Sequence, residues 1–250
     1  MPRFFIAGTN IFGDRAIMTG RDAEHMHVLR LHPGDDVILC DTKGNDYKCR
    51  LIKSTKEEAE AEIIEVTPCK SEPSVKVTVL CGLPKGNDRI DYIIQKSVEA
   101  GAYEICFFES SRCVAKIDDD DKRAKKLERW QRIAEEAAKQ SGRGIIPQVC
   151  WVGTFVDAIN EANKSELKLF LYETGDDREK LNEVLEAGKN VESIAIITGP
   201  EGGFAQFEAD IIKSVGLDFH TCSMGERILR CETAPVVALS AAMFATGNLG

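Results

Sequence analysis

Two short strings of residues combine glycines with charged side chains and could carry out chemistry on a bound ligand. The first is Thr-Gly-Pro-Glu-Gly-Gly at 198–203, and the second is Gly-Glu-Arg-Ile-Leu-Arg-Cys-Glu-Thr-Ala at 225–234. Glycine has no Cβ, so the glycines of the first string let its backbone approach a flat ligand closely. The arginine and glutamate side chains suit proton transfer and the stabilisation of a developing charge. We therefore predict a ligand site built from these two strings.

Each string adjoins an apolar run that would position it. Residues 194–197 read Ile-Ala-Ile-Ile, which predicts a buried parallel strand before the first string. Residues 235–245, after the second string, are too continuously apolar for a surface helix and predict a buried one. The glycines could instead serve only tight strand-to-helix turns. Two glycine-bearing loops beside charged residues favour the ligand site.

Residues from about 73 onward alternate between strand-like and helical patterns, which predicts an α/β layer with a mostly parallel sheet. We expect strands at 75–80, 104–108, 167–172, 193–197 and 219–223, and helices at 88–100 and 121–140. The acidic run at 118–121 suits the positive end of the second helix dipole. A calcium site is not expected there, because the EF-hand spacing is absent.

Residues 1–70 read as short strands separated by turns, a pattern typical of a small β-barrel. We expect these strands at 3–7, 15–18, 37–41, 47–53 and 59–66. One helix is expected at 22–31, where His-Pro-Gly-Asp at 32–35 would end it. The sequence thus predicts two domains, 1–70 and 73–250.

The composition is that of an ordinary globular protein, with 43% hydrophobic residues. A continuous apolar run long enough for a membrane span and the apolar region of a secretory signal are both missing, so we expect a cytoplasmic protein with no membrane partner. The nine cysteines include no Cys-x-x-Cys pair, and Cys81, Cys106 and Cys222 lie in apolar runs. We expect them to be small hydrophobic residues rather than zinc ligands or disulfide partners.

The formal net charge of −9 at first disfavours a nucleic-acid partner. The acidic excess is concentrated late in the chain, since residues 148–250 carry 16 acidic and 8 basic side chains. A polyanion could still bind across residues 1–147.

Several common motifs are absent, namely the P-loop, the Rossmann glycine fingerprint and the nucleophile elbow. His25, His27 and His32 lie close in sequence, but no carboxylate or thiol completes a metal-binding set. We therefore expect no metal, and we expect these histidines to stabilise turns or contact RNA.

Further strings follow one another in a specific order along nearly the whole chain. They include Arg3-Phe4-Phe5, His27-Val28-Leu29-Arg30, Lys85-Gly86, Gln95-Lys96, Ser111-Arg112, Glu128-Arg129-Trp130, Gly199-Pro200-Glu201-Gly202-Gly203-Phe204 and Ile228-Leu229-Arg230. In this order they resemble the RsmE family, bacterial methyltransferases of the SPOUT class that modify N3 of a uracil in small-subunit (16S) ribosomal RNA.

The resemblance implies a PUA-like β-barrel at 1–70 that helps to hold RNA, and an α/β domain at 73–250 whose chain forms a trefoil knot. It implies S-adenosylmethionine as methyl donor, and a homodimer that acts on ribosomal RNA or the small ribosomal subunit. In such enzymes three loops contact the cofactor largely through backbone groups. Mapped onto this chain, the cofactor-binding residues are Leu171, Tyr172, Glu173, Thr198, Gly199, Pro200, Gly202, Gly203, Cys222, Met224, Gly225, Ile228 and Leu229.

Methylation of uracil N3 requires N3 to lose its proton, and the resulting negative charge spreads over the ring oxygens. We expect Arg230 to stabilise this charge, because it directly follows the expected cofactor loop. Glu232 and Glu201 are candidate bases, although each could instead orient an arginine. RNA contacts are expected at Arg3, Arg30, Lys85, Arg89, Arg112 and Arg143.

Cys231 stands where family members usually carry Thr, and Cys113 where they commonly carry Ser. Each change loses a strong hydrogen-bonding hydroxyl, so we expect tuned rather than lost activity. Two alternatives stay open: ribose 2′-O-methylation by the same fold, and a non-catalytic RNA-binding or assembly protein. The residues at 228–232 replace the Ser-Leu-Asn string of ribose-methylating relatives, and the intact glycine loops disfavour a non-catalytic protein.

Overall fold

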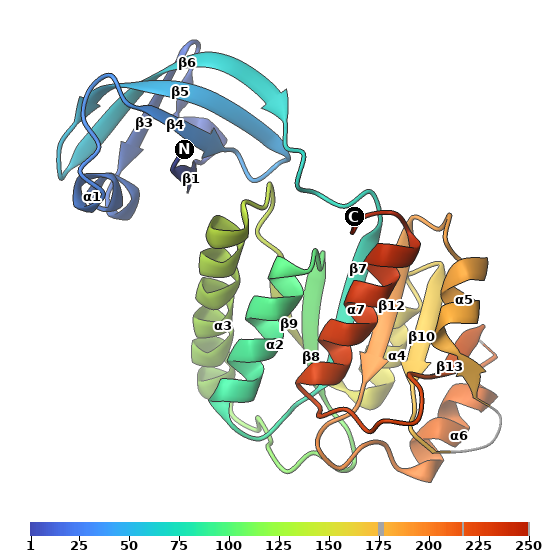
Figure 1. Ribbon diagram of the computed structural model, residues 1–250. Helices are drawn as coiled ribbons and strands as arrows, with labels where there is room; N and C mark the ends of the chain where they lie inside the picture. Colours follow the sequence, from blue (N-terminus) through green and yellow to red (C-terminus); the bar gives the residue numbers. More distant parts are fainter. Residues whose placement is uncertain (175–177, 217, 250) are drawn as a thin grey trace. The chain divides into compact units, whose positions relative to one another are not determined.

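The computed structural model describes residues 1–174, 178–216 and 218–249, and its contacts divide the chain into two compact units (Figure 1). The first unit combines Met1–Glu72 with Ala138–Ile146, and the second combines Pro73–Ala137 with Pro147–Gly250. Each unit has its own sheet and its own hydrophobic core. A short stretch from the middle of the chain thus belongs to the first unit.

The first unit contains a six-stranded sheet in the order β1-β4-β5-β6-β3-β2, in which β1 and β4 are parallel and the other neighbours antiparallel. Its elements are β1 (Arg3–Phe5), the 3-10 turn η1 (Gly8–Asn10), β2 (Ile11–Phe12), β3 (Arg15–Thr19), α1 (Arg21–Val28), β4 (Asp36–Cys40), β5 (Asn45–Ser54) and β6 (Glu58–Pro68). Burial alternates at the start of β6, where Ala59 and Ala61 are buried and Glu58 and Glu60 are not. This alternation is the period that predicted the strands.

The helix α1 ends earlier than predicted. The sequence pointed to the proline and glycine after residue 31, but the helix stops at Val28. Arg30 adopts a left-handed backbone conformation with φ of 56°, and the backbone N–H groups of Arg30 and Leu31 donate to carbonyls of the last turn. This arrangement is a Schellman motif, in which a non-glycine residue here takes the place usually held by glycine.

A buried ion pair ties the stretch 138–146 into the first unit. The Arg143 guanidinium, whose residue is 2% exposed, donates to both oxygens of Glu72, each at 2.9 Å. Arg3 donates to Asp46 at 2.7 and 2.8 Å, and to the backbone carbonyl of Arg143 at 3.0 Å. Both guanidinium groups are thus engaged within the first unit, and the prediction that Arg3 and Arg143 contact RNA stays a prediction.

The second unit contains a seven-stranded sheet in the order β11-β13-β10-β12-β7-β8-β9, and its paired strands are all parallel. The strands are β7 (Lys76–Gly82), β8 (Glu104–Glu109), β9 (Gln148–Thr154), β10 (Leu167–Leu171), β11 (Glu179–Lys180), β12 (Ser193–Thr198) and β13 (Phe219–Ser223). The central strands are buried on both faces, which explains their continuous apolar runs. The two-residue edge strand β11 has no such run, whereas the edge strand β9 contains the apolar run 149–152, and neither strand was predicted.

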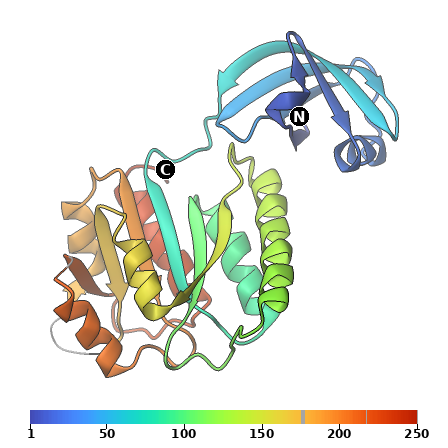
Figure 2. The ribbon, with the colours of Figure 1, turned by 180° about the vertical axis from the view of Figure 1, so that it is seen from behind.

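Helices cover both faces of this sheet. They are α2 (Asn87–Glu99), α3 (Asp120–Ser141), α4 (Phe155–Ala162), α5 (Leu181–Ala187), α6 (Gln206–Ser214) and α7 (Thr233–Ala245). Figure 1 shows α2 and α7 in front of the sheet, and Figure 2 shows α4 on the opposite face. The α/β class is the predicted one, and the trefoil knot implied by the resemblance stays a prediction.

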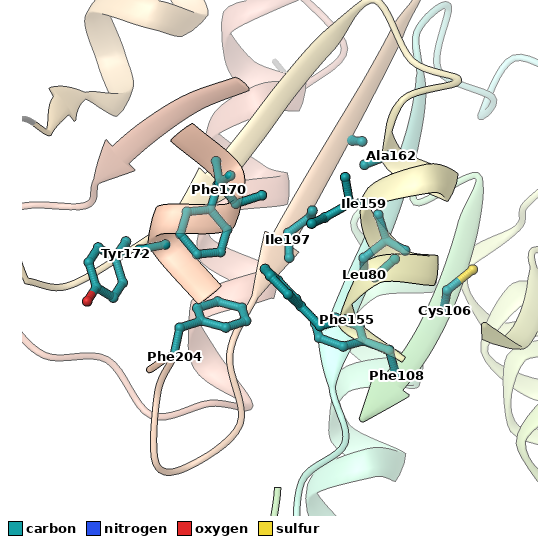
Figure 3. Packing of buried hydrophobic residues seen from close by; sticks show 14 residues of the cluster. Leu80, Cys106, Phe108, Phe155, Ile159, Ala162, Phe170, Tyr172, Ile197 and Phe204 are labelled. Carbon is teal, nitrogen blue, oxygen red and sulfur yellow. The ribbon is translucent and has the colours of Figure 1, made fainter. Parts of the chain in front are cut away.

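An aromatic cluster fills the space beneath α4. The Phe155 ring of α4 lies 5.4 Å from the ring centroid of Phe204 and 6.1 Å from that of Phe170 (Figure 3). Phe204 and Phe170 are themselves 4.6 Å apart. Because Phe204 follows the first glycine string directly, this cluster fixes one end of that string in the core.

The prediction that the cysteines stay unpaired was wrong, because a disulfide joins Cys106 of β8 to Cys150 of β9. The two residues are direct partners on adjacent strands, with Cα atoms 4.5 Å apart. Cys150 lies on a strand that was not predicted, so the pairing was missed with that strand. The Glu104 carboxylate lies within 4.8 Å of both sulfurs, but disulfide sulfurs are not thiolate ligands.

The apolar helix predicted after residue 234 forms as α7, but it is not buried all round. Ala238, Leu239 and Ala242 face the core, whereas Val237 is 42% and Phe244 71% exposed. The prediction of a fully buried helix was therefore wrong for the single chain. Within the described ranges, every helix is too short or too polar to cross a membrane.

Trp130→Ala is expected to lower the free energy of unfolding by about 3–5 kcal/mol, because it removes a large side chain from a packed site. Trp130 of α3 is 0% exposed and its ring lies 4.9 Å from that of Phe107. Urea unfolding followed by circular dichroism measures the change. Val114→Ala, at a residue 69% exposed, serves as the control and should shift stability by less than about 0.5 kcal/mol. Equal effects of the two substitutions would contradict the packing described here.

Candidate functional site

A cavity of about 540 Å³ opens at the carboxyl ends of β10, β12 and β13, where ligands commonly bind in α/β sheets. The last residues of β10 and β12, Leu171 and Thr198, line it together with the adjoining loops. Its lining comprises Arg89, Leu171, Tyr172, Glu173, Thr174, Thr198, Gly199, Pro200, Glu201, Gly202, Gly203, Phe204, Cys222, Ser223, Met224, Arg227, Ile228, Leu229, Arg230, Cys231, Glu232 and Ala234. The two predicted strings therefore meet in one hollow of ligand size.

The backbone of the first string requires glycine at Gly203. This residue has a φ of 61°, which an L side chain rarely adopts, and a Cβ there would lie 2.1 Å from Glu173 Oε1. A Cβ on Gly199 would lie 3.2 Å from backbone atoms of Gly203. The string thus folds tightly on itself, and its backbone rather than its side chains forms that wall of the cavity.

Arg89, near the start of α2, connects the acidic residues of both strings. Its guanidinium pairs with Glu201, and its Nε lies 3.7 Å from Glu232 Oε2. The backbone N–H of Lys85 also donates to Glu201 Oε1 at 2.7 Å. The carboxylate of Glu201 is therefore engaged by a cation and a backbone donor, the arrangement of a structural partner rather than of a group waiting to accept a proton.

Glu232 is held as a carboxylate. Partial burial alone would raise its pKa, but its own backbone N–H and the Cys231 thiol donate to it, the latter at 3.3 Å. The positive charges of Arg89 and Arg230 also favour the charged form, so the pKa of Glu232 lies below its ordinary value. Burial and the neighbouring carboxylates raise the pKa of Cys231 to about 12, so that residue stays a thiol.

Arg230 lies at the mouth of the cavity and is exposed. No carboxylate among the described residues lies within ion-pair distance of its guanidinium, although Glu232 attracts it electrostatically. Arg89, by contrast, is paired with the carboxylates of Glu201 and Glu232. Arg230 is thus a cation available to a ligand.

The structure brings most of the predicted site residues together. All of the expected cofactor-binding residues line the cavity except Gly225, whose N–H donates to Ser223 in the same loop. The three expected catalytic residues also line it. Six further lining residues were not among the expected site residues: Thr174, Phe204, Ser223, Arg227, Cys231 and Ala234. All of them except Ala234 adjoin an expected residue in sequence.

The residues expected to contact RNA are scattered. Arg89 lines the cavity, and Lys85 precedes its helix. Arg112 donates to the Gly202 carbonyl at 2.9 Å while its residue remains exposed. Arg30 lies beyond the end of α1 in the first unit.

Comparison with known proteins defines the class of this fold and site. Residues 70–243 match the family model of the RNA methyltransferase domain, and residues 18–64 match that of the RNA methyltransferase PUA domain. The chain is therefore an RNA methyltransferase with an N-terminal PUA domain.

Relatives of known name share almost the full length of the chain. Ribosomal RNA small subunit methyltransferase E of Bacillus subtilis (strain 168) is 36% identical, over 98% of this chain and 97% of the relative. A crystal structure of ribosomal RNA small subunit methyltransferase E from Neisseria gonorrhoeae, bound to S-adenosyl methionine, is 31% identical with a TM-score of 0.83, covering 98% and 97% of the two chains. The chain belongs to the ribosomal RNA small subunit methyltransferase E family.

Arg89→Met is expected to raise the pKa of Glu232, because one of the charges that favour the carboxylate disappears. The depressed pKa of Glu232 contributes stability that is present above its ordinary value of 4.5 and is lost as the pH falls through the lower folded value. In Arg89→Met this contribution to stability should be smaller, and its loss should be complete at higher pH. Carbon-detected NMR titration of the Glu232 carboxyl measures the midpoint.

Arg132→Met serves as the control, since Arg132 pairs with Glu128 on the surface of α3. That variant should leave the Glu232 midpoint unchanged. An unchanged midpoint in Arg89→Met would show that Arg89 does not act on Glu232.

Proposed function

We propose that this protein transfers a methyl group from S-adenosylmethionine to N3 of a uridine in small-subunit (16S) ribosomal RNA. The observation that carries this proposal is the cavity of about 540 Å³ in which glycine-rich backbone meets an unengaged arginine. Membership of the family and the cofactor named for the Neisseria gonorrhoeae structure support the same assignment.

The residues present fit S-adenosylmethionine. An adenine ring needs an apolar slot with backbone donors and acceptors nearby, and Leu171, Ile228 and Leu229 line the cavity beside the loop 199–203. The carboxylates of Glu173, Glu201 and Glu232 lie on the same lining and complement the positive charge of a sulfonium. When bound, the cofactor supplies an electrophilic methyl group.

The chain must then stabilise the uracil as an anion. N3 of neutral uracil has no free lone pair, so N3 loses its proton before or as its bond to the methyl carbon forms. Arg230 is placed to donate to a ring oxygen on which the negative charge develops. Arg89 cannot serve in this way, because Glu201 and Glu232 hold it.

Glu232 orients the cationic groups, and the N3 proton leaves to water. Its pKa lies below the ordinary value for a glutamate, which makes it a weak base. Glu201 is engaged by Arg89 and the Lys85 backbone. These contacts favour the orienting role, which the sequence left open, for both carboxylates.

The RNA contacts form part of the same proposal. Arg30, Lys85 and Arg112 are the expected RNA-binding residues that stay clear of buried ion pairs and of the cavity. The first unit, as a PUA domain, would hold the ribosomal RNA or small ribosomal subunit. The cytoplasm is the expected location.

A homodimer completes the proposal. Phe244 and Val237 expose apolar surface on α7, and the neighbouring helix α2 carries Tyr92, which is 42% exposed. An apolar face on adjacent helices suits a second copy of this chain. The dimer explains why so apolar a helix leaves one side uncovered.

Arg230→Ala is expected to abolish methylation while leaving the dissociation constant for S-adenosylmethionine within about tenfold of the wild-type value, because the charge acts on the uracil rather than on the cofactor. Transfer of labelled methyl to small-subunit RNA gives the rate, and calorimetry gives the affinity. Arg132→Ala, at an arginine that pairs with Glu128 on the surface of α3, is the control and should retain most of the activity. Normal turnover in Arg230→Ala would remove Arg230 from the mechanism.

Phe244→Glu is expected to convert the protein to monomers, because it places a charge on the apolar face of α7. Sedimentation equilibrium measures the mass. Val114→Glu, at another exposed apolar residue, should leave the mass unchanged. A dimer that persists in Phe244→Glu would place the interface elsewhere.

A further inference from the structure

The connection from β8 to α3 contacts the first glycine string but does not line the cavity. Arg112 Nη1 in this connection donates to the Gly202 carbonyl at 2.9 Å. A Cβ on Gly202 would lie only 3.1 Å from the Arg112 Cβ, so this backbone approach is close. The connection thus contacts the middle of the first string, although its own residues do not line the cavity.

The same connection is bound by Glu208, a buried carboxylate in the first turn of α6. Glu208 is 2% exposed, and it accepts from the Ser111 backbone N–H at 2.9 Å and from the Ser111 hydroxyl at 3.0 Å. It also accepts from the Ala205 N–H at 2.8 Å. Three donors on one buried carboxylate make a strong link, because charge-assisted bonds gain strength where water is excluded.

Glu208 therefore links the residue that follows the aromatic anchor of the first string to the connection from β8 to α3. Ala205 lies immediately after Phe204, whose ring is packed in the aromatic cluster, and two residues after the end of the string. Ser111 is the neighbour of Arg112, which holds Gly202. The acidic side chain also suits the positive N-terminus of α6.

We infer that Glu208 is a positioning residue for methyl transfer: through Ser111, Arg112 and Ala205 it fixes the backbone at 199–203 in the geometry that binds the cofactor. This inference rests on the proposed function. Because that wall of the cavity is backbone, its position sets both the affinity for the cofactor and the alignment of the methyl group. Small displacements of reacting groups are costly in such sites.

Glu208→Gln tests the inference in the full-length protein. The amide keeps the size of the side chain but replaces one acceptor oxygen with an NH2 group, which would face the N–H donors that Glu208 binds now. Calorimetric titration with S-adenosylmethionine should give a dissociation constant raised roughly tenfold or more, as expected for the loss of a hydrogen bond to a buried charged group. The methyl-transfer rate at saturating cofactor should also fall.

Glu109→Gln is the matched control. Glu109 is the last residue of β8, directly before the same connection, and accepts from the Ile117 N–H at 2.8 Å. Among the described residues, no hydrogen bond or ion pair links it to the glycine string. If Glu208 were only a stabilising residue, both variants would lose stability and both would keep wild-type affinity and rate at a temperature where they are folded. A selective loss of affinity and rate in Glu208→Gln supports positioning.

Ser111→Ala keeps the inference testable if Glu208→Gln does not fold. It removes only one of the three donors, so the dissociation constant should rise by several-fold, and the double variant should lose less than the product of the two single effects. Wild-type protein that fails to bind the cofactor would overturn the proposed function. Wild-type binding with unchanged affinity and rate in Ser111→Ala and in any folded Glu208→Gln would overturn this inference alone.

Discussion

The packing of Phe204 against Phe155 and Phe170 is the contact on which the site depends. Phe204 is 3% exposed and sits at the point where the glycine string enters the core. A glycine-rich backbone has little stiffness of its own, because glycine loses more conformational freedom on folding than any other residue. The aromatic ring at one end and β12 at the other hold the string between two rigid supports (Figure 3).

Electrostatics divide the charged residues of the cavity into two groups. Arg89 pairs with Glu201 and Glu232 and stays within that set. Arg230 keeps an exposed guanidinium on the same lining. Because Arg89 at the start of α2 pairs with the two carboxylates, neither Arg230 nor Arg227, which also lines the cavity, is needed to pair with them.

Local patterns predicted the features that depend on local physics. The buried central strands, α2, α3 and the meeting of the two glycine strings follow from apolar runs, helical spacing and backbone freedom in the sequence. The strand β11 has two charged residues and no apolar pattern to indicate it. The apolar run 149–152 of β9 was not assigned to a strand, and the Cys106–Cys150 pair was missed with it. The ion pairs of Arg3 and Arg143 join residues that lie 43 and 71 positions apart in sequence, which no local pattern reveals.

The first unit is built from two separate stretches of the chain, and this limits how the protein can be divided into fragments or recombined with homologues. A fragment that begins at Pro73 would carry Arg143 without Glu72, and the backbone N–H of Gly144 would lose the carboxylate that it reaches at 2.6 Å. Separating the partners of a buried ion pair typically costs about 3–5 kcal/mol. Exchange of the N-terminal unit between homologues therefore has to carry residues 138–146 with it, so these two distant stretches of the chain should evolve as one inherited block.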